Sequence, residues 1–339
     1  MRAGRIPTAV AALLLACAAP AARAEPSLVI GPYKHAPLAF DAHTHLMQAA
    51  PADTTPAQPL AQALAPGAVV SWAFATGDCG NEHWGDGIVT ERFAQANVAA
   101  FVQAKQRYIV STGGQGQQFH CDSDEGMERF IARYASPQLV GFDFDIEAGQ
   151  SDASINALVR QIARAQARHP GLRMSFTLPT FAASDGSGRS LNRIGQRVLA
   201  ALRKHRVRDP YINLMVMNYG RAHASRCVLK ATPEGQRCDM ARSALRAAQN
   251  LHEGQRVPMN HIELTAMIGV NDVVENVFTL ADAEQLGRAV REQGLGGLHW
   301  WSLDRDTPCP PAEAGVSPRC SGLAQPPQAY SRAFLQALP

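Results

Sequence analysis

Short apolar runs and amphipathic stretches alternate along most of the chain. The apolar runs are rich in β-branched and aromatic residues and end in glycine or polar residues, whereas the stretches between them carry apolar residues at helical spacing. Strands are predicted at residues 68–75, 108–112, 139–147, 172–178, 211–218, 261–268 and 298–303, after a first strand within 28–46 whose register the pattern does not fix. Helices are predicted at residues 93–106, 125–134, 153–168, 191–204, 240–252 and 280–293.

Nearly continuous apolar runs are typical of parallel strands that helices cover. About eight strand–helix units predict an α/β fold, the (β/α)8 TIM barrel. No break in composition interrupts the pattern, so residues 25–339 are expected to form one catalytic domain. In this architecture the side chains at the carboxyl ends of the strands carry the chemistry.

The predicted strand at 139–147 differs from the others because Asp143, Asp145 and Glu147 recur at alternate positions. Alternate side chains of a strand share one face, so three like charges would lie together. Burying even one of them costs several kcal/mol unless it is hydrogen-bonded or protonated, which favours catalysis over the commoner interpretation of acidic strand residues as a solvated face. Crowding raises carboxyl pKa values and can supply the protonated acid that glycosidic hydrolysis needs. Glu147, nearest the strand's carboxyl end, is the predicted acid.

The first 24 residues have the pattern of a signal peptide. Arg2 and Arg5 precede an apolar run at 9–15, and small residues at 22 and 24 suit cleavage. An alternative is a lipoprotein signal, in which Cys17 becomes a lipidated N-terminus. Both readings predict a secreted or periplasmic protein. The apolar run is too short for a transmembrane helix, which needs about 20 residues.

Removal of the predicted signal changes the charge and the cysteine count. It takes away three of the 32 basic residues and no acidic ones, leaving 29 of each, so nucleic acid is not an expected partner. Six cysteines remain, and an even number in an exported chain favours three disulfides. Sequence does not fix their connectivity. The simplest pairing joins nearest neighbours: Cys79 with Cys121, Cys227 with Cys238, and Cys309 with Cys320.

The order Gly-x-Asp-x-Asp-x-Glu at residues 141–147 resembles the signature of family 18 chitinases. The resemblance extends, in order, to residues 72–74, 110–114, 175–179, 215–220, 267–272 and 301–306. It implies a retaining, endo-type hydrolase that cleaves β-1,4-linked N-acetylglucosamine in chitin or its oligosaccharides. No metal or cofactor is implied, because the substrate's own acetamido oxygen is the nucleophile and an oxazoline is the intermediate. We also expect a monomer.

The resemblance assigns roles by position. Glu147 is the acid, and Asp145 holds the acetamide nitrogen. Asp143 exchanges a proton with Asp145, and Tyr219 donates to the acetamide oxygen. Trp301 forms the floor beneath the sugar, since an indole ring packs well on an apolar C–H face. Further substrate contacts are expected from Phe74, Gly113, Gly114, Met215, Met217 and Asn218.

Several of these residues have a second interpretation or depart from the family pattern. The methionines share a face and could equally be core residues. Only one of Trp300 and Trp301 can face the barrel, and the other is expected in the core. Val140 and Asn218 stand where many family members have aspartate. Because asparagine cannot supply a charge, Asn218 is expected to shift the pH profile or the substrate preference.

Two other functions fit parts of the sequence. A chitin-binding protein without activity could share the fold, but it would need a broken acid or acetamide pair. His43 and His45 resemble the His-x-His metal motif that opens the barrel of metal-dependent amidohydrolases, with two imidazoles alternating along a strand. The later predicted strands at 139–147, 172–178 and 211–218 lack the further histidines of that family, so surface histidines are the simpler interpretation.

Overall fold

The computed structural model describes residues 1, 28–49, 57–311, 313 and 315–336. Apart from Met1, the predicted signal peptide, with Cys17, lies outside these residues. Among the described helices, none has the length and apolar content needed to cross a membrane.

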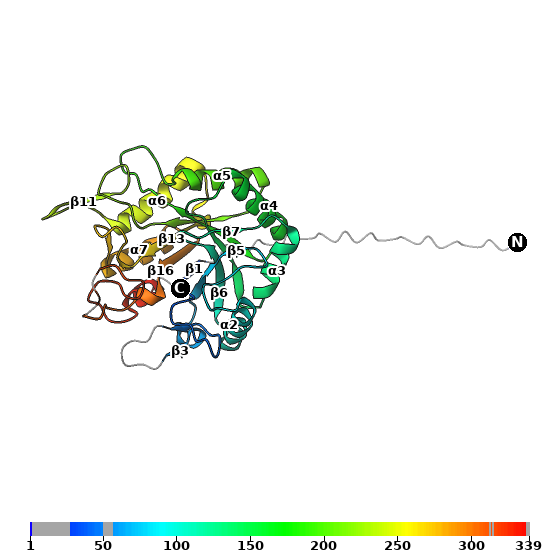
Figure 1. Ribbon diagram of the computed structural model, residues 1–339. Helices are drawn as coiled ribbons and strands as arrows, with labels where there is room; N and C mark the ends of the chain where they lie inside the picture. Colours follow the sequence, from blue (N-terminus) through cyan, green and yellow to red (C-terminus); the bar gives the residue numbers. More distant parts are fainter. Residues whose placement is uncertain (2–27, 50–56, 312, 314, 337–339) are drawn as a thin grey trace.

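Eight parallel strands close into a barrel, in chain order around the ring (Figure 1). They are β1 (Val29–His35), β4 (Val69–Ala75), β6 (Arg107–Gly113), β8 (Leu139–Asp145), β9 (Arg173–Pro179), β10 (Tyr211–Met215), β13 (Ile262–Met267) and β16 (Gly297–Trp301). The predicted (β/α)8 barrel is confirmed. The first strand escaped precise prediction because its sequence, VIGPYKH, contains Gly31 and Pro32, which weaken a strand pattern.

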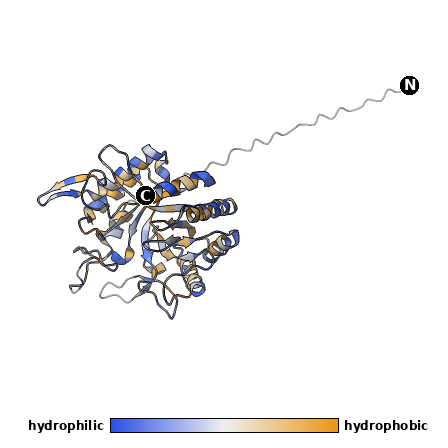
Figure 2. Cartoon of the chain, turned by 45° about the horizontal axis from the view of Figure 1, so that its top comes forward, coloured by the Kyte–Doolittle hydropathy of each residue, from blue (hydrophilic) through white to orange (hydrophobic). Residues whose placement is uncertain are grey.

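Helices surround the barrel and pack their apolar faces on it (Figure 2). They are α1 (Leu60–Ala63), α2 (Thr90–Ala104), α3 (Asp124–Tyr134), α4 (Asp152–Arg168), α5 (Arg193–His205), α6 (Met240–Gln255), α7 (Leu280–Glu292) and α8 (Ala329–Leu335), with 3-10 turns η1 (Met259–His261) and η2 (Leu303–Arg305). Polar caps fix several helix starts; Thr279 and Asp282 form a capping box on α7. The sequence pattern missed α1 and α8, which are short.

Short strand pairs lie in the connections between the barrel strands. They are β2 (Gln48–Ala49) with β3 (Gln58–Pro59), β5 (Gly77–Asp78) with β7 (Phe119–His120), β11 (Leu229–Thr232) with β12 (Gly235–Cys238), and β14 (Gly269–Val270) with β15 (Val277–Phe278). The three disulfides join the cysteines as the nearest-neighbour pairing predicted.

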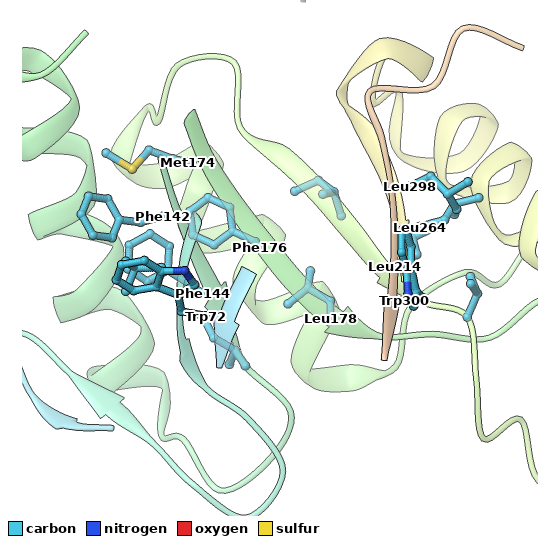
Figure 3. Close-up of a cluster of buried hydrophobic side chains, with 14 of the residues drawn as sticks. Trp72, Phe142, Phe144, Met174, Phe176, Leu178, Leu214, Leu264, Leu298 and Trp300 are labelled. Carbon is cyan, nitrogen blue, oxygen red and sulfur yellow. The ribbon is translucent and has the colours of Figure 1, made fainter. Parts of the chain in front are cut away.

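Side chains alternate along β8 as the sequence predicted. Phe142 and Phe144 point outward into the layer between the strands and the helices (Figure 3). The ring of Phe142 lies 4.9 Å from that of Phe130 on α3, centroid to centroid. Asp143 points into the barrel, where hydroxyl groups of β1 and β9 reach it. The apolar residues therefore hold the strand in place while the acidic residues face the interior.

Several predicted strands end one to three residues earlier than expected, and two of these early ends shape the site. The acidic strand ends at Asp145, so Glu147 lies two residues beyond it. The strand β10 ends at Met215 rather than at residue 218. Asn218 has φ of 50°, a left-handed conformation that a strand cannot continue through. Both early ends place polar side chains in loops at the carboxyl end of the barrel.

Candidate active site

A cavity of about 290 Å³ opens at the carboxyl end of the barrel. Asp145 and Glu147 line it on the side of β8, and Met215 lines it from β10. Phe74 and Trp301 line it from β4 and β16. Side chains predicted separately from distant segments thus meet in one pocket, at the end of the barrel where the fold is expected to carry chemistry.

Asp143 is the deepest of the three acids and is well hydrogen-bonded. Its carboxylate accepts from the hydroxyl groups of Tyr33 (2.9 Å), Ser111 (2.6 Å) and Thr177 (2.7 Å). Burial raises its pKa to about 6, although the Ser111 and Thr177 hydrogen bonds act in the opposite direction. Asp143 does not line the cavity, whereas Asp145, two residues further along β8, does.

Asp145 sits above Asp143 and reaches the cavity. It is 5% exposed, and its buried Oδ1 has no hydrogen-bond partner among the described residues. Burial raises its pKa well above the ordinary value, and the charges of Glu147 and Asp143 raise it further. A buried polar atom without a partner is uncommon in proteins, and here it belongs to a residue that lines the cavity.

Glu147 is half-buried at the mouth of the pocket. Burial raises its pKa to about 7, and the nearby charge of Asp272 contributes. A carboxyl group with a pKa near 7 keeps its proton at neutral pH, as a general acid must. The sequence predicted crowding by carboxylates of the same strand as the reason, whereas the causes in the structure are burial and Asp272, a carboxylate from the loop after β13.

Asn218 fixes that loop. Its side chain donates from Nδ2 to Oδ2 of Asp272 (2.9 Å) and accepts at Oδ1 from the backbone N–H of Val273 (3.0 Å). Its own backbone N–H donates to Oδ1 of Asn271 (3.2 Å). Asn218 lines the cavity as expected, and the charge that it cannot supply reaches the pocket from Asp272 beside it.

Aromatic rings form one side of the pocket. The rings of Phe74 and Trp301 stack with centroids 5.5 Å apart and planes 13° from parallel. The ring of His35 lies 5.9 Å from that of Trp301. Trp300 instead points away from the barrel, is fully buried and stacks on Phe334 (Figure 3). The prediction that only one of the two tryptophans faces the barrel is therefore confirmed.

Tyr219 is 3% exposed, and burial raises the pKa of its hydroxyl group. That hydroxyl has no partner among the described residues. It does not line the cavity. Met215 and Met217 both do, so the pocket interpretation of the two methionines is the one that the structure supports.

Gly113 and Gly114 do not line the cavity either. A Cβ atom on Gly113 would lie 2.1 Å from the backbone oxygen of Asp145, and one on Gly114 would lie 2.6 Å from the ring of Phe74. Both have positive φ. The pair allows Asp145 and Phe74 to pack closely on β6. Direct contact of these glycines with a sugar stays a prediction.

The histidine motif does not lie in a barrel strand. His43 is exposed within a turn, and His45 follows it in the loop that the Phe40–Met47 bridge closes. The alternative in which the two imidazoles alternate along a strand opening the barrel is wrong, because β1 has already ended at His35; the favoured interpretation, histidines outside the barrel strands, agrees with the structure. Within the described residues, no group of three or more His, Cys, Asp or Glu side chains is arranged to hold a metal ion.

Sequence reasoning missed several pocket residues. Tyr33 lies in the first strand, whose register the sequence pattern did not fix. Asp272 lay within a matching segment but received no role. Arg305 and the segment 316–318 also line the cavity. The signal that could have found Asp272 is its position just after a predicted strand, at the carboxyl end of the barrel.

Comparisons with known proteins agree with this geometry. The chain is 27% identical over 274 residues to a probable bifunctional chitinase/lysozyme of Escherichia coli (strain K12). It is 26% identical over 255 residues to Endochitinase 11 of Metarhizium anisopliae. These alignments cover 74% and 70% of this chain but only 29% and 47% of the two relatives' own lengths. No protein-family model matches the chain.

Solved structures share the fold. The catalytic domain of a hyperthermophilic chitinase from Pyrococcus furiosus superposes with a TM-score of 0.70 and 25% identity, covering 92% of this chain and 95% of that one. Human YKL-39, a pseudo-chitinase with retained chitooligosaccharide binding, shares the fold alone, with a TM-score of 0.53, 12% identity and coverage of 92% and 100%. Fold and sequence together define a chitinase-like barrel protein. The relatives and the solved structures support the predicted resemblance to chitinase-like proteins of glycoside hydrolase family 18.

Proposed function

We propose that this protein is a retaining endo-type glycoside hydrolase that cleaves β-1,4-linked N-acetylglucosamine polymers or oligomers. The observation that carries the proposal is the pairing of a pocket glutamate, Glu147, whose pKa is raised to about 7, with a neighbouring buried carboxylate, Asp145, that has an unpartnered oxygen. The first is suited to give a proton near neutral pH, and the second is suited to accept a hydrogen bond from a ligand.

In the proposed reaction, Glu147 donates its proton to the glycosidic oxygen as the bond to C1 breaks. The carbonyl oxygen of the substrate's acetamido group attacks C1 and forms an oxazoline. Asp145 accepts the hydrogen bond of the acetamide N–H and stabilises the positive charge that develops there. Water then attacks C1 while Glu147 takes back a proton, which restores the acetamide and retains the configuration.

Two further residues support Asp145 in this scheme. Asp143, held by three hydroxyl donors, exchanges a proton with Asp145, and its pKa of about 6 keeps that exchange accessible near neutral pH. Tyr219 donates its hydroxyl hydrogen to the acetamide oxygen. Its hydroxyl has no partner within the described part of the chain. The ring of Trp301 lies beneath the sugar. No metal or cofactor takes part, because the substrate supplies the nucleophile.

We further propose that residues 25–339 form the catalytic domain and that the protein acts outside the cytoplasm as a monomer. Three disulfides support an oxidising compartment. The signal pattern of residues 1–24 supports export, either as a secreted or periplasmic protein or as a lipoprotein attached through Cys17.

The test is release of a fluorophore from an N-acetylchitobioside by the wild type and by Glu147→Gln. Loss of the general acid is expected to lower kcat by about a hundredfold or more. Glu125→Gln, at an exposed position on α3, is the matched control and should keep full activity. A wild type that binds chitooligosaccharides without cleaving them would identify a binding protein instead. Near-full activity of Glu147→Gln would contradict the mechanism.

A further inference from the structure

The segment 316–318 forms a wall of the pocket. Val316, Ser317 and Pro318 line the same cavity as Asp145 and Glu147. They belong to the connection between η2 and α8, after the last barrel strand. No role follows for this segment from the acidic motif or from the other matching segments of the sequence.

A buried guanidinium attaches this wall to the barrel. The side chain of Arg305 donates to the backbone oxygens of Ile268 (3.1 Å) and Val270 (2.5 Å), and also to that of Ser317. Arg305 is 1% exposed, and burial lowers its pKa to about 10, which leaves it charged at neutral pH. A planar group with several donors joins three backbone oxygens of two segments in one geometry, which a lysine could not do.

Hydrogen bonds and a disulfide also fix the residues that follow the segment. The backbone N–H of Ser321 donates to the oxygen of Thr307 (3.0 Å), and its own oxygen accepts from the N–H of Val270 (2.7 Å). Next to it, Cys320 is buried and forms the disulfide with Cys309. The disulfide therefore closes a loop, residues 309–320, that carries the wall. Such a link restricts the conformations open to the enclosed residues.

The wall presents apolar surface to the pocket. Val316 is 37% exposed, and Pro318 is also exposed. Apolar side chains at the edge of a polar pocket suit a ligand with both kinds of surface. A pyranose ring is such a ligand, because its C–H groups are apolar while its hydroxyl groups are polar.

On the basis of the proposed function, we propose that the segment 316–318 is a specificity wall for chito-oligosaccharides. Val316 and Pro318 contact the C–H surface of a bound sugar unit, and the Cys309–Cys320 disulfide and Arg305 hold them there. The wall at 316–318 acts on substrate binding and takes no part in proton transfer, so it is expected to affect KM rather than kcat.

The test uses Val316→Ala and the double variant C309S/C320S, with N-acetylchitohexaose as substrate. The matched control is C227S/C238S. Both disulfides join cysteines 11 residues apart, but the control disulfide lies at the β11–β12 hairpin, which projects from the barrel (Figure 1). Similar loop sizes imply similar losses of stability. Val316→Ala changes an exposed side chain and is expected to fold normally.

We expect both wall variants to raise KM about three- to tenfold, the range set by losing part of an apolar contact. Their kcat should stay within about twofold, with the pH profile unchanged, and the control should keep the wild-type KM. The proposal is overturned if the wild type cleaves the hexasaccharide and neither wall variant changes KM, or if the control raises KM equally. A wild type that binds without cleaving moves the test to Kd, with the same expected ratios. A wild type that does neither contradicts the proposed function as well.

Discussion

Glu263 and Asp145 are both buried inside the barrel, one near its amino end and the other at its carboxyl end. Around Glu263 the charges are compensated: Arg173 forms an ion pair with it, and Ser175 donates a hydrogen bond of 2.5 Å. Burial would raise the pKa of Glu263, but Arg173, His299 and Ser175 together bring it below the ordinary value. Around Asp145, burial and two further carboxylates all raise the pKa.

These two positions show what distinguishes a structural carboxylate from a reactive one in this barrel. Burial is nearly the same at the two positions, with 1% and 5% of the side chains exposed, so burial does not decide the role. The neighbours do. A carboxylate beside a cation keeps its charge and stabilises the fold as long as the pair is intact, whereas one beside other carboxylates can hold or pass a proton near neutral pH.

The largest expected effect comes from breaking the compensated pair. Arg173→Met leaves the charge of Glu263 buried without its partner and should lower the free energy of unfolding by about 3–5 kcal/mol. Urea unfolding at pH 7 measures this loss. The double variant Arg173→Met with Glu263→Leu removes both charges and should recover most of the stability. A loss below about 1 kcal/mol in Arg173→Met would show that the pair is not structural.

Removing a charge at the carboxyl end should have the opposite result, with little effect on stability and a large effect on activity. Asp145→Asn removes a carboxylate whose neighbours repel it, so Tm should not fall. Because asparagine cannot stabilise the charge on the acetamide, kcat should fall about a hundredfold or more. Thermal unfolding and hydrolysis of the N-acetylchitobioside measure the two effects on one preparation. A fall in Tm as large as that of Arg173→Met would contradict the comparison.

A smaller effect is expected on the pH dependence of stability. The folded-state pKa of Glu147 is about 7, above its ordinary value of 4.5, so folding favours the protonated form. That contribution is present below about pH 4.5 and is lost as the pH rises through 7. Glu147→Gln avoids the loss. It should therefore raise Tm by about 2–5 °C at pH 8 and change it little at pH 4.5. Equal changes at both pH values would contradict the raised pKa.

Much of this contrast could be predicted from the sequence. Alternating acids on an otherwise apolar strand predicted that Asp143 and Asp145 face the interior, and the run of strand–helix units predicted the barrel around them. The nearest-neighbour disulfides were also correct. These features are local: each depends on periodicity or spacing within a short segment, which the chain carries whatever its neighbours are.

The missed features are long-range. The proximity of Asp272 to Glu147 depends on how the loop after β13 folds, and Asn218 fixes that loop through hydrogen bonds from the loop after β10. The pairing of Arg173 with Glu263 joins two strands 90 residues apart in sequence. No short-range pattern marks such pairs. The wall at 316–318 likewise depends on a buried guanidinium and a disulfide whose effects appear only in the folded chain.

The smallest expected effect tests that long-range contact directly. Asp272→Asn removes a negative charge near Glu147 but keeps an oxygen that can accept from Asn218. Since a nearby negative charge disfavours ionisation, its removal should lower the pKa of Glu147, and burial, the larger cause, remains. The alkaline limb of the kcat/KM profile should therefore move to lower pH by about a few tenths of a unit. Glu275→Gln, on the same loop and exposed, is the matched control and should leave the limb in place. A limb that moves to higher pH in Asp272→Asn, or moves equally in the control, would show that the charge of Asp272 does not act on Glu147.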